Sequence, residues 1–244
     1  MKIAIVGYGK MGREIESKAV QSGHLISFII DKGNSGDFEN ILPSNTDIII
    51  EFTQPASVIH NILKGFSKGI PFVTGTTGWY DKLEEVSTQC KDQNGTLFYA
   101  PNFSLGVNLF LEFSRVLSAK LSKFPGYGVH IEETHHTQKL DSPSGTAIAL
   151  ANNILPYHKN LTSWKNSEDS LESELPIISH RINNVTGKHK LFYESESDII
   201  ELAHEAKNRS GFAIGAILAA EFVLNKKGVF TMPDLLKYKF EFNN

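Results

Sequence analysis

The sequence has very little cysteine, no long apolar run and no large excess of charge of either sign. Cys90 is the single cysteine among 244 residues, so an internal disulfide, a zinc ribbon and an iron–sulfur cluster are excluded. The longest apolar runs, such as 3–6 and 48–50, fall far short of the ~20 residues that span a bilayer. The net charge of −3 comes without a basic run, so we expect neither a membrane nor a nucleic acid as partner.

Apolar side chains are abundant enough to exclude a disordered chain. Hydrophobic residues make up 41% and charged residues 21%, which is typical of a globular protein with one large domain or two modest ones. The first residues run directly into a glycine turn, without the ~7–15-residue apolar stretch of a secretion signal. We therefore expect a cytoplasmic protein.

The first hundred residues alternate short apolar runs with amphipathic stretches. This alternation is typical of parallel strands joined by crossover helices, and it predicts a Rossmann-like, doubly wound α/β domain over 1–103. The expected strands are 2–6, 25–30, 47–51, 70–74 and 96–99, and the expected helices are 10–21, 55–67 and 80–93.

The period of the apolar residues changes after residue 104. The pattern predicts an α+β domain with an open, mostly antiparallel or mixed sheet over 104–208. Its expected helices are 105–122 and 145–155, and its expected strands are 129–134, 176–182, 190–194 and 198–204. An apolar helix at 211–224 is expected to pack on the first domain, followed by a short turn at 233–236. Residues 209–244 would then make the first domain discontinuous.

The segment 157–174 is polar and, at about 18 residues, longer than most connections in a compact domain. We expect a mobile surface loop. The sequence leaves open whether this loop is a lid over a site or a solvated insertion.

A glycine pattern follows the first expected strand and precedes the first expected helix. Gly7, Gly9 and Gly12 fit G-x-G-x-x-G, which allows a tight turn, a close approach of a pyrophosphate and close packing of helix on strand. The alternative is a glycine turn used only for packing. The predicted dinucleotide contacts of this loop are Gly7, Tyr8, Gly9, Lys10, Met11 and Gly12.

The second expected strand ends at an acid followed by a cation. Asp31 is placed to accept hydrogen bonds from the adenosine ribose. Lys32 is placed to pair with a 2′-phosphate, so the dipeptide leaves NADH and NADPH open as cofactors.

Two further loops follow strands at the sheet edge where ligands of such folds bind. They are interpreted as cofactor contacts, with ordinary turn chemistry as the alternative. Their residues are Gly75, Thr76 and Thr77 in the first loop, and Ala100, Pro101, Asn102 and Phe103 in the second.

Titratable groups concentrate over 132–147, where a strand gives way to a helix. His135 and His136 are adjacent on an extended backbone, so they face opposite sides and we expect no metal site there. With Lys139 close by, the cluster indicates an acidic small molecule as substrate and proton transfer as chemistry.

The start of the helix in this stretch carries Ser144, Gly145 and Thr146. Free N–H groups and hydroxyls at a helix N-terminus favour a carboxylate. Ser144 as a simple helix cap explains the same pattern equally well.

The chain resembles the 4-hydroxy-tetrahydrodipicolinate reductase (dihydrodipicolinate reductase) family over essentially its whole length. The first matching motif is generic and the last is highly specific. In chain order the motifs are Gly7-x-Gly9-x-x-Gly12, Phe52-Thr53-x-Pro55, Gly75-Thr76-Thr77-Gly78, Asn102-Phe103-Ser104-x-Gly106-Val107-Asn108 and His135-His136-x-x-Lys139-x-Asp141-x-Pro143-Ser144-Gly145-Thr146-Ala147.

The resemblance implies a reaction and roles for the residues. NADH or NADPH on the first domain would give a hydride to C4 of a cyclic imine dicarboxylate, with loss of its 4-hydroxyl, in the diaminopimelate route of lysine biosynthesis. His135 and Lys139 match the family's acid/base pair, and Lys139 would donate a proton to the ring. The carboxylate-binding positions match His136, Ser144, Gly145 and Thr146. The resemblance also implies a homotetramer assembled through the open sheets of the second domain.

Three positions depart from the family pattern. The glycine loop is one residue shorter, which is expected to shift its phosphate contacts by a residue. Glu51 replaces the usual Asp before Phe-Thr and is expected to be harmless. Lys188 stands where an acid is common and is expected to loosen a support of the second domain.

Two other functions remain open. A different two-domain NAD(P)-dependent oxidoreductase of amino-acid metabolism would keep the glycine loop without needing Lys139 beside a carboxylate site. A non-catalytic dinucleotide sensor would bind NADH without turnover and would not need His135.

Overall fold

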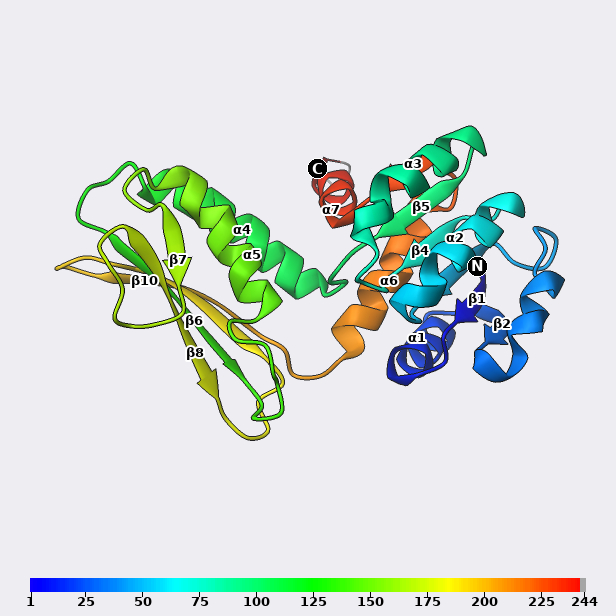
Figure 1. Cartoon of the computed structure of the whole chain (residues 1–244), viewed down its shortest axis with the longest axis horizontal. Coiled ribbons are helices and arrows are strands. Elements are labelled where there is room, and N and C mark those ends of the chain that lie inside the picture. Colours follow the sequence, from blue (N-terminus) through cyan, green and yellow to red (C-terminus); the bar gives the residue numbers. More distant parts are fainter. Residues whose placement is uncertain (242–244) are drawn as a thin grey trace. The chain divides into compact units, whose positions relative to one another are not determined.

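A computed structural model describes residues 1–241, and the chain divides into two compact units (Figure 1). The first unit combines Met1–Leu105 with the segment that begins at Arg209, and the second is Gly106–Asn208. Among the described residues, no helix has both the length and the apolar character needed to cross a bilayer.

The first unit is built on a parallel six-stranded sheet in the order β11-β5-β4-β3-β1-β2. Its strands are β1 (Lys2–Val6), β2 (Leu25–Ile30), β3 (Ile48–Glu51), β4 (Phe72–Thr74), β5 (Thr96–Tyr99) and β11 (Gly228–Phe230). Its helices are α1 (Lys10–Gln21), α2 (Pro55–Ser67), α3 (Leu83–Asp92), α6 (Ser210–Val223) and α7 (Met232–Glu241), with 3-10 segments η1 (Lys32–Asn40) and η2 (Tyr80–Lys82).

Both faces of this sheet are covered, which explains why inner strands such as β1 and β3 carry continuous apolar runs. In β1, Ile3 and Ile5 pack into a core with residues of α1 and α6. Ala4 and Val6 point the other way, into a second core with α2 and α3 that also contains the buried Cys90. The Rossmann-like fold class predicted from the sequence is confirmed.

The second unit holds a mixed five-stranded sheet in the order β10-β9-β6-β8-β7. Its strands are β6 (Gly128–His135), β7 (Ser163–Lys165), β8 (Glu174–Arg181), β9 (Lys188–Glu194) and β10 (Ile199–Glu205), and its helices are α4 (Leu105–Leu121), α5 (Gly145–Ile154) and the 3-10 turn η3 (Leu155–Tyr157). β6 and β8 run parallel, whereas β9 runs antiparallel to β6 and β10.

One face of this sheet packs against α4 and α5. Ile131 of β6 and Leu191 of β9 share a core with Phe110 of α4 and Leu150 of α5. Because side chains alternate along a strand, every second residue of β6 after Ile131 also points toward the helices. The end of β6 therefore places polar residues on the face of the sheet that packs against α4 and α5.

The structure corrects several sequence-based bounds. The expected loop 157–174 contains the strand β7, which pairs with β8 through Ser163 and Glu174. The turn expected at 233–236 is the ten-residue helix α7. The strand β11 was not predicted, because its three residues owe their extended form to pairing with β5, far away in the sequence.

Candidate active site

The glycine loop of the first unit is shaped by close backbone contacts. Gly7 has a φ of +93°, and a Cβ there would lie 2.1 Å from the Phe52 carbonyl oxygen. A Cβ on Gly12 would lie 2.2 Å from the Gly7 carbonyl oxygen. At Gly9, the N-cap of α1, a Cβ would meet nothing within 4 Å. Packing thus requires glycine at the first and third positions, and the second faces open space at a helix N-terminus.

A cavity of about 790 Å³ opens beside this loop. Its size suits a large organic ligand. It brings together five of the residues predicted to contact the dinucleotide, namely Gly7, Tyr8, Gly9, Asp31 and Lys32. The other predicted residues do not line it, and they are Lys10, Met11, Gly12, Gly75, Thr76, Thr77, Ala100, Pro101, Asn102 and Phe103.

Asp31 holds the turn that forms one wall of this cavity. Its carboxylate accepts a hydrogen bond from the Lys32 backbone N–H at 2.9 Å. The Asn34 side-chain oxygen in turn accepts one from the Asp31 backbone N–H at 2.7 Å. Asp31 and Lys32 are both exposed, which leaves them accessible to a ligand.

The loop 75–77 is tied to the body of the first unit through Thr76. The buried carboxyl of Glu51 accepts hydrogen bonds from the hydroxyls of Thr53 and Thr74, the latter at 2.6 Å. Thr76 Oγ1 accepts one from the Thr53 N–H at 2.8 Å. Burial raises the pKa of Glu51 against the opposing effect of these hydroxyls. The longer acid that departs from the family pattern is thus fully hydrogen-bonded.

Phe103, predicted as a cofactor contact, has its side chain in the core. It is 1% exposed, and its ring centroid lies 5.6 Å from that of Phe52 and 5.7 Å from that of Phe98. Its ring therefore supports the loop from within.

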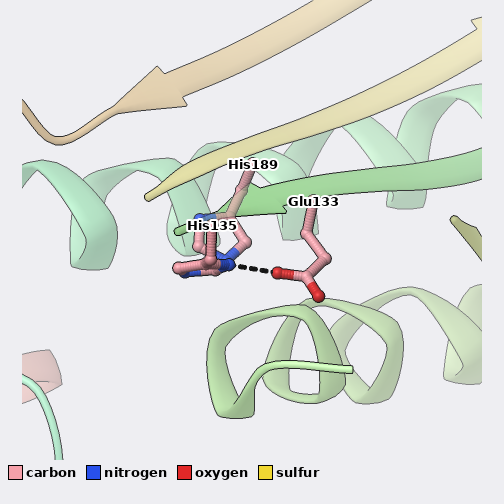
Figure 2. Close-up of side chains that lie close together, drawn as sticks. All are labelled: Glu133, His135 and His189. Atoms are coloured by element: carbon pink, nitrogen blue, oxygen red, sulfur yellow. Dashed lines mark hydrogen bonds and ion pairs between the residues drawn. The ribbon is translucent and has the colours of Figure 1, made fainter. Parts of the chain in front are cut away.

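In the second unit, the end of β6 carries a buried acid and a histidine on one face (Figure 2). Glu133 is 0% exposed and His135 8% exposed. One carboxylate oxygen of Glu133 forms a short hydrogen bond with His135 Nδ1. The other accepts a hydrogen bond from Arg181 Nη1 at 2.9 Å. Burial raises the pKa of Glu133, but hydrogen bonds from His135, Ser179 and Arg181 outweigh it and lower that pKa to about 2.

A second histidine, His189 on β9, joins this group. Its ring centroid lies 5.0 Å from that of His135, and its Nε2 lies 2.9 Å from Ser144 Oγ. Burial, and then the charge of His135, lower the pKa of His189 to about 3, so that it is neutral at pH 7. Ser144 Oγ also accepts a hydrogen bond from the Ala147 N–H at 3.2 Å. Ser144 is therefore the N-cap of α5, which was one of its two predicted roles.

Lys139 is held in the loop between β6 and α5. Its ammonium lies 2.8 Å and 2.9 Å from the two carboxylate oxygens of Asp141, and its side chain is 22% exposed. The hydrogen bond from Lys139 lowers the pKa of Asp141. Arg181 Nη2 donates to the Asp141 carbonyl oxygen at 2.6 Å. Arg181 thus connects the carboxylate beside His135 to the loop that carries Lys139.

His136 and Lys188 occupy distinct surroundings. Within the described part of the chain, His136 Nδ1 is buried without a hydrogen-bond partner. Lys188 Nζ lies 3.2 Å from a carboxylate oxygen of Glu205 on the adjacent strand β10. The cation that departs from the family pattern therefore has an anionic partner.

The sequence interpretation missed Glu133, Arg181 and His189. Glu133 had a usable signal, since it lies two residues before His135 on a strand and must share its face. Arg181 and His189 come from β8 and β9, and only the strand register brings them to β6.

The ligand atoms of Glu133, His135 and His189 lie within 4.8 Å of one another, a spacing that suits a metal ion. The guanidinium of Arg181 on the same carboxylate opposes a divalent cation there. The absence of a resident metal stays a prediction, and metal analysis of the purified protein tests it.

We expect the free energy of unfolding to fall as the pH drops below about 6.5. Between pH 6.5 and pH 3 an unfolded chain protonates His189, whereas the folded chain keeps it neutral, so acid favours unfolding. Urea unfolding measures the free energy of unfolding at pH 7 and at pH 5. Between these two pH values it should fall by about 2 kcal/mol less in His189→Gln than in wild type. An equal loss in both proteins would contradict the buried neutral state of His189.

Comparison with known proteins places both units in one family. Family models described as dihydrodipicolinate reductase, N-terminus and C-terminus, match residues 1–103 and 106–236. The chain is 44% identical over 243 residues to the 4-hydroxy-tetrahydrodipicolinate reductase of Christiangramia forsetii, covering 99% of this chain and 100% of the relative. It is 32% identical to that of Clostridium novyi, covering 95% and 96%.

A solved structure shares the fold. The dipicolinate-bound dihydrodipicolinate reductase from Paenisporosarcina sp. TG-14 matches with a TM-score of 0.79 at 23% identity, covering 95% of this chain and 97% of that one. The family models span nearly the whole chain, and the resemblance inferred from the sequence motifs is confirmed. The chain belongs to the dihydrodipicolinate reductase family of NAD(P)H-dependent oxidoreductases.

Proposed function

We propose that the first unit holds the reduced nicotinamide cofactor, and that the second unit binds a dicarboxylate and supplies the protons. The activity itself follows from family membership. The chain is a 4-hydroxy-tetrahydrodipicolinate reductase of the diaminopimelate route to lysine.

The glycine loop and its cavity support the assignment of the cofactor to the first unit. Gly9, the N-cap of α1, lines the cavity and a Cβ there would meet open space, so a pyrophosphate could approach the backbone at the start of this helix. When bound, a reduced nicotinamide supplies the hydride that reaches C4 of the substrate. Asp31 would accept hydrogen bonds from the adenosine ribose, as its place in the cavity wall allows.

The observation that carries the assignment of the second unit is the single network that joins His135, Lys139 and the start of α5. Glu133 and Arg181 link His135 to the loop that carries Lys139 through hydrogen bonds. His189 is in ring contact with His135 and is hydrogen-bonded to Ser144. A carboxylate at the α5 N-terminus would meet the N–H groups of Gly145 and Thr146, where the helix dipole favours an anion. The Paenisporosarcina relative is described with dipicolinate, a cyclic dicarboxylate, bound.

Proton transfer is the task we assign to Lys139 and His135. The 4-hydroxyl would leave as water together with a proton from the adjacent ring carbon. The hydride would then add at C4, and the ammonium of Lys139 would return a proton to that adjacent carbon. His135 would exchange a proton with the same substrate, and His136 would bind its carboxylate. Groups of this kind typically contribute ~10²–10⁴-fold to a rate when they reach the reacting atoms.

The open face of the second sheet supports a homotetramer. On this face His130 and Phe192 stack with centroids 4.6 Å apart, and Ile199 is 60% exposed. We expect sedimentation velocity to show a tetramer. A monomer at micromolar concentration would contradict this assembly.

The cytoplasmic location stays a prediction.

Lys32 is expected to favour NADPH through the 2′-phosphate. Because an ammonium there pairs with a phosphate that NADH lacks, Lys32→Ala should raise the KM for NADPH about three- to tenfold more than the KM for NADH. Initial rates with each cofactor measure this difference. Lys82→Ala removes an exposed lysine outside the cavity and should change neither KM. Equal effects on the two cofactors in Lys32→Ala would show that Lys32 does not contact the 2′-phosphate.

An assay with freshly made 4-hydroxy-tetrahydrodipicolinate tests the function. The wild-type chain should oxidise NADH or NADPH only when this substrate is present. Dinucleotide binding without any turnover would instead support a sensor. Turnover with a different amino-acid-derived substrate, and none with 4-hydroxy-tetrahydrodipicolinate, would support another oxidoreductase with the same two-domain architecture.

A further inference from the structure

We propose that Glu133 is a positioning residue that fixes His135 with its proton on Nδ1 and leaves Nε2 as the nitrogen that meets the substrate. This inference deepens the proposed function, since it rests on the role of His135 in proton transfer. It adds a residue that the sequence interpretation did not assign.

Strand geometry holds Glu133 in place. It lies two residues before His135 on β6, and both side chains point to the same face. In the sheet, Glu133 pairs with Ser179 of β8 on one side and with His189 of β9 on the other. A central strand with neighbours on both sides gives the carboxylate little freedom to move away from His135.

The charge state of Glu133 decides the direction of its hydrogen bond. Arg181 donates to Oε1 at 2.9 Å and stabilises the ionised carboxylate despite its burial. An ionised carboxylate has only acceptor atoms, so the proton shared with His135 resides on Nδ1. The pKa of Glu133, lowered to about 2, agrees with this assignment.

The other charged and titratable groups around His135 do not compete for Nδ1. His189 faces it from β9, but its Nε2 is hydrogen-bonded to Ser144. Lys139 and Asp141, in the loop that follows β6, are paired with each other. Glu133 is thus the acceptor that determines which nitrogen of His135 carries the proton.

The opposite edge of the His135 ring is left clear by a glycine. A Cβ on Gly187 would lie 3.0 Å from His135 Nε2 and 3.2 Å from its Cδ2, so a side chain there would crowd this edge. Among the described residues, His135 Nε2 has no hydrogen-bond partner. The ring therefore has one edge bound to protein and one edge available to a ligand.

This arrangement prepares Nε2 for proton transfer in either direction. With Nδ1–H held by Glu133, a neutral ring presents the lone pair of Nε2 as a base. When Nε2 is also protonated, the nearby carboxylate stabilises the positive ring, which then acts as an acid. Without Glu133, the ring can turn or move its proton to the wrong nitrogen.

The test compares wild type with Glu133→Gln and Glu133→Asp. We expect Glu133→Gln to lower kcat by ~10²–10⁴-fold and to change the KM for substrate by less than about threefold. Glu133→Asp keeps the charge, and its kcat should be at least about tenfold higher than that of Glu133→Gln. Glu196→Gln is the control, because Glu196 is exposed in the turn between β9 and β10, away from His135 and outside both faces of the sheet, and its kcat should match wild type.

Nitrogen-15 NMR of the histidine side chains provides a readout that does not depend on activity. We expect His135 to show protonated Nδ1 in wild type and in Glu133→Asp, and mixed or Nε2-protonated forms in Glu133→Gln. A wild-type His135 protonated on Nε2 alone, or a Glu133→Gln enzyme with wild-type kcat, would overturn the proposal. If Glu133→Gln does not fold, the wild-type spectrum still decides, because a His135 protonated on Nε2 alone overturns the proposal.

The outcome for Glu133 can be separated from that for the proposed function. Wild-type turnover in His135→Gln would remove His135 from the reaction, whatever its tautomer. Loss of turnover in His135→Gln, with a normal kcat in Glu133→Gln, would retain the proposed function and refute the positioning role.

Discussion

Lys139→Ala should lower kcat by ~10²–10⁴-fold and leave dinucleotide affinity nearly unchanged. The reason is that the variant loses the ammonium we assign to ring protonation, while the cofactor cavity lies in the other unit. Stopped-flow or steady-state rates measure kcat, and fluorescence titration with NADH measures affinity. The loss should persist at saturating substrate, because the missing group acts on the chemical step.

A matched control separates this effect from a general loss of positive charge. Lys190 lies on β9 of the same unit and pairs with Glu201 of β10 at 2.8 Å. Lys190→Ala should therefore retain kcat within about threefold. A Lys139→Ala enzyme that turns over at the wild-type rate would remove Lys139 from the mechanism.

His135→Gln should lower kcat by ~10²–10⁴-fold with little change in dipicolinate binding. Glutamine is similar in length and can still donate to Glu133, but it cannot carry a proton to and from the substrate at neutral pH. Glu133 also keeps its bond with Arg181, so the buried carboxylate does not lose its counter-ion. Calorimetric titration with dipicolinate checks that the carboxylate site remains intact.

The control for His135 is a histidine on the other face of the same strand. His130 stacks on Phe192, away from the proposed site, and a His130→Gln protein that sediments like wild type should retain kcat within about threefold. If His135→Gln and His130→Gln have the same kcat, His135 is not a proton carrier.

Local signals in the sequence were sufficient for the N-terminal part of the first unit. Its strands alternate with amphipathic helices, and the bounds of β1, β2 and β5 are those expected from the apolar runs. The glycine loop was predictable because its three glycines form a local pattern between a strand and a helix, although Gly7 also packs against the distant Phe52. The three-residue strand β11 gives no such local signal.

The candidate site of the second unit was predictable only in part. The site residues between His135 and Thr146 lie close together in the sequence, so they could be identified from it. The side chains that orient it come from other strands. Arg181 pairs with His135 across the parallel β6–β8 register, and His189 pairs with Glu133 across the antiparallel β6–β9 register. Periodicity predicts that these strands exist, but it does not predict how they are aligned.

A crystal structure with oxidised cofactor and pyridine-2,6-dicarboxylate bound together tests most directly whether the two units act on one substrate. We expect a carboxylate of the ligand at the N-terminus of α5, with Lys139 Nζ and His135 Nε2 on the ring beside nicotinamide C4. A ligand bound elsewhere, or Lys139 and His135 turned away from the nicotinamide in the ternary complex, would contradict the account.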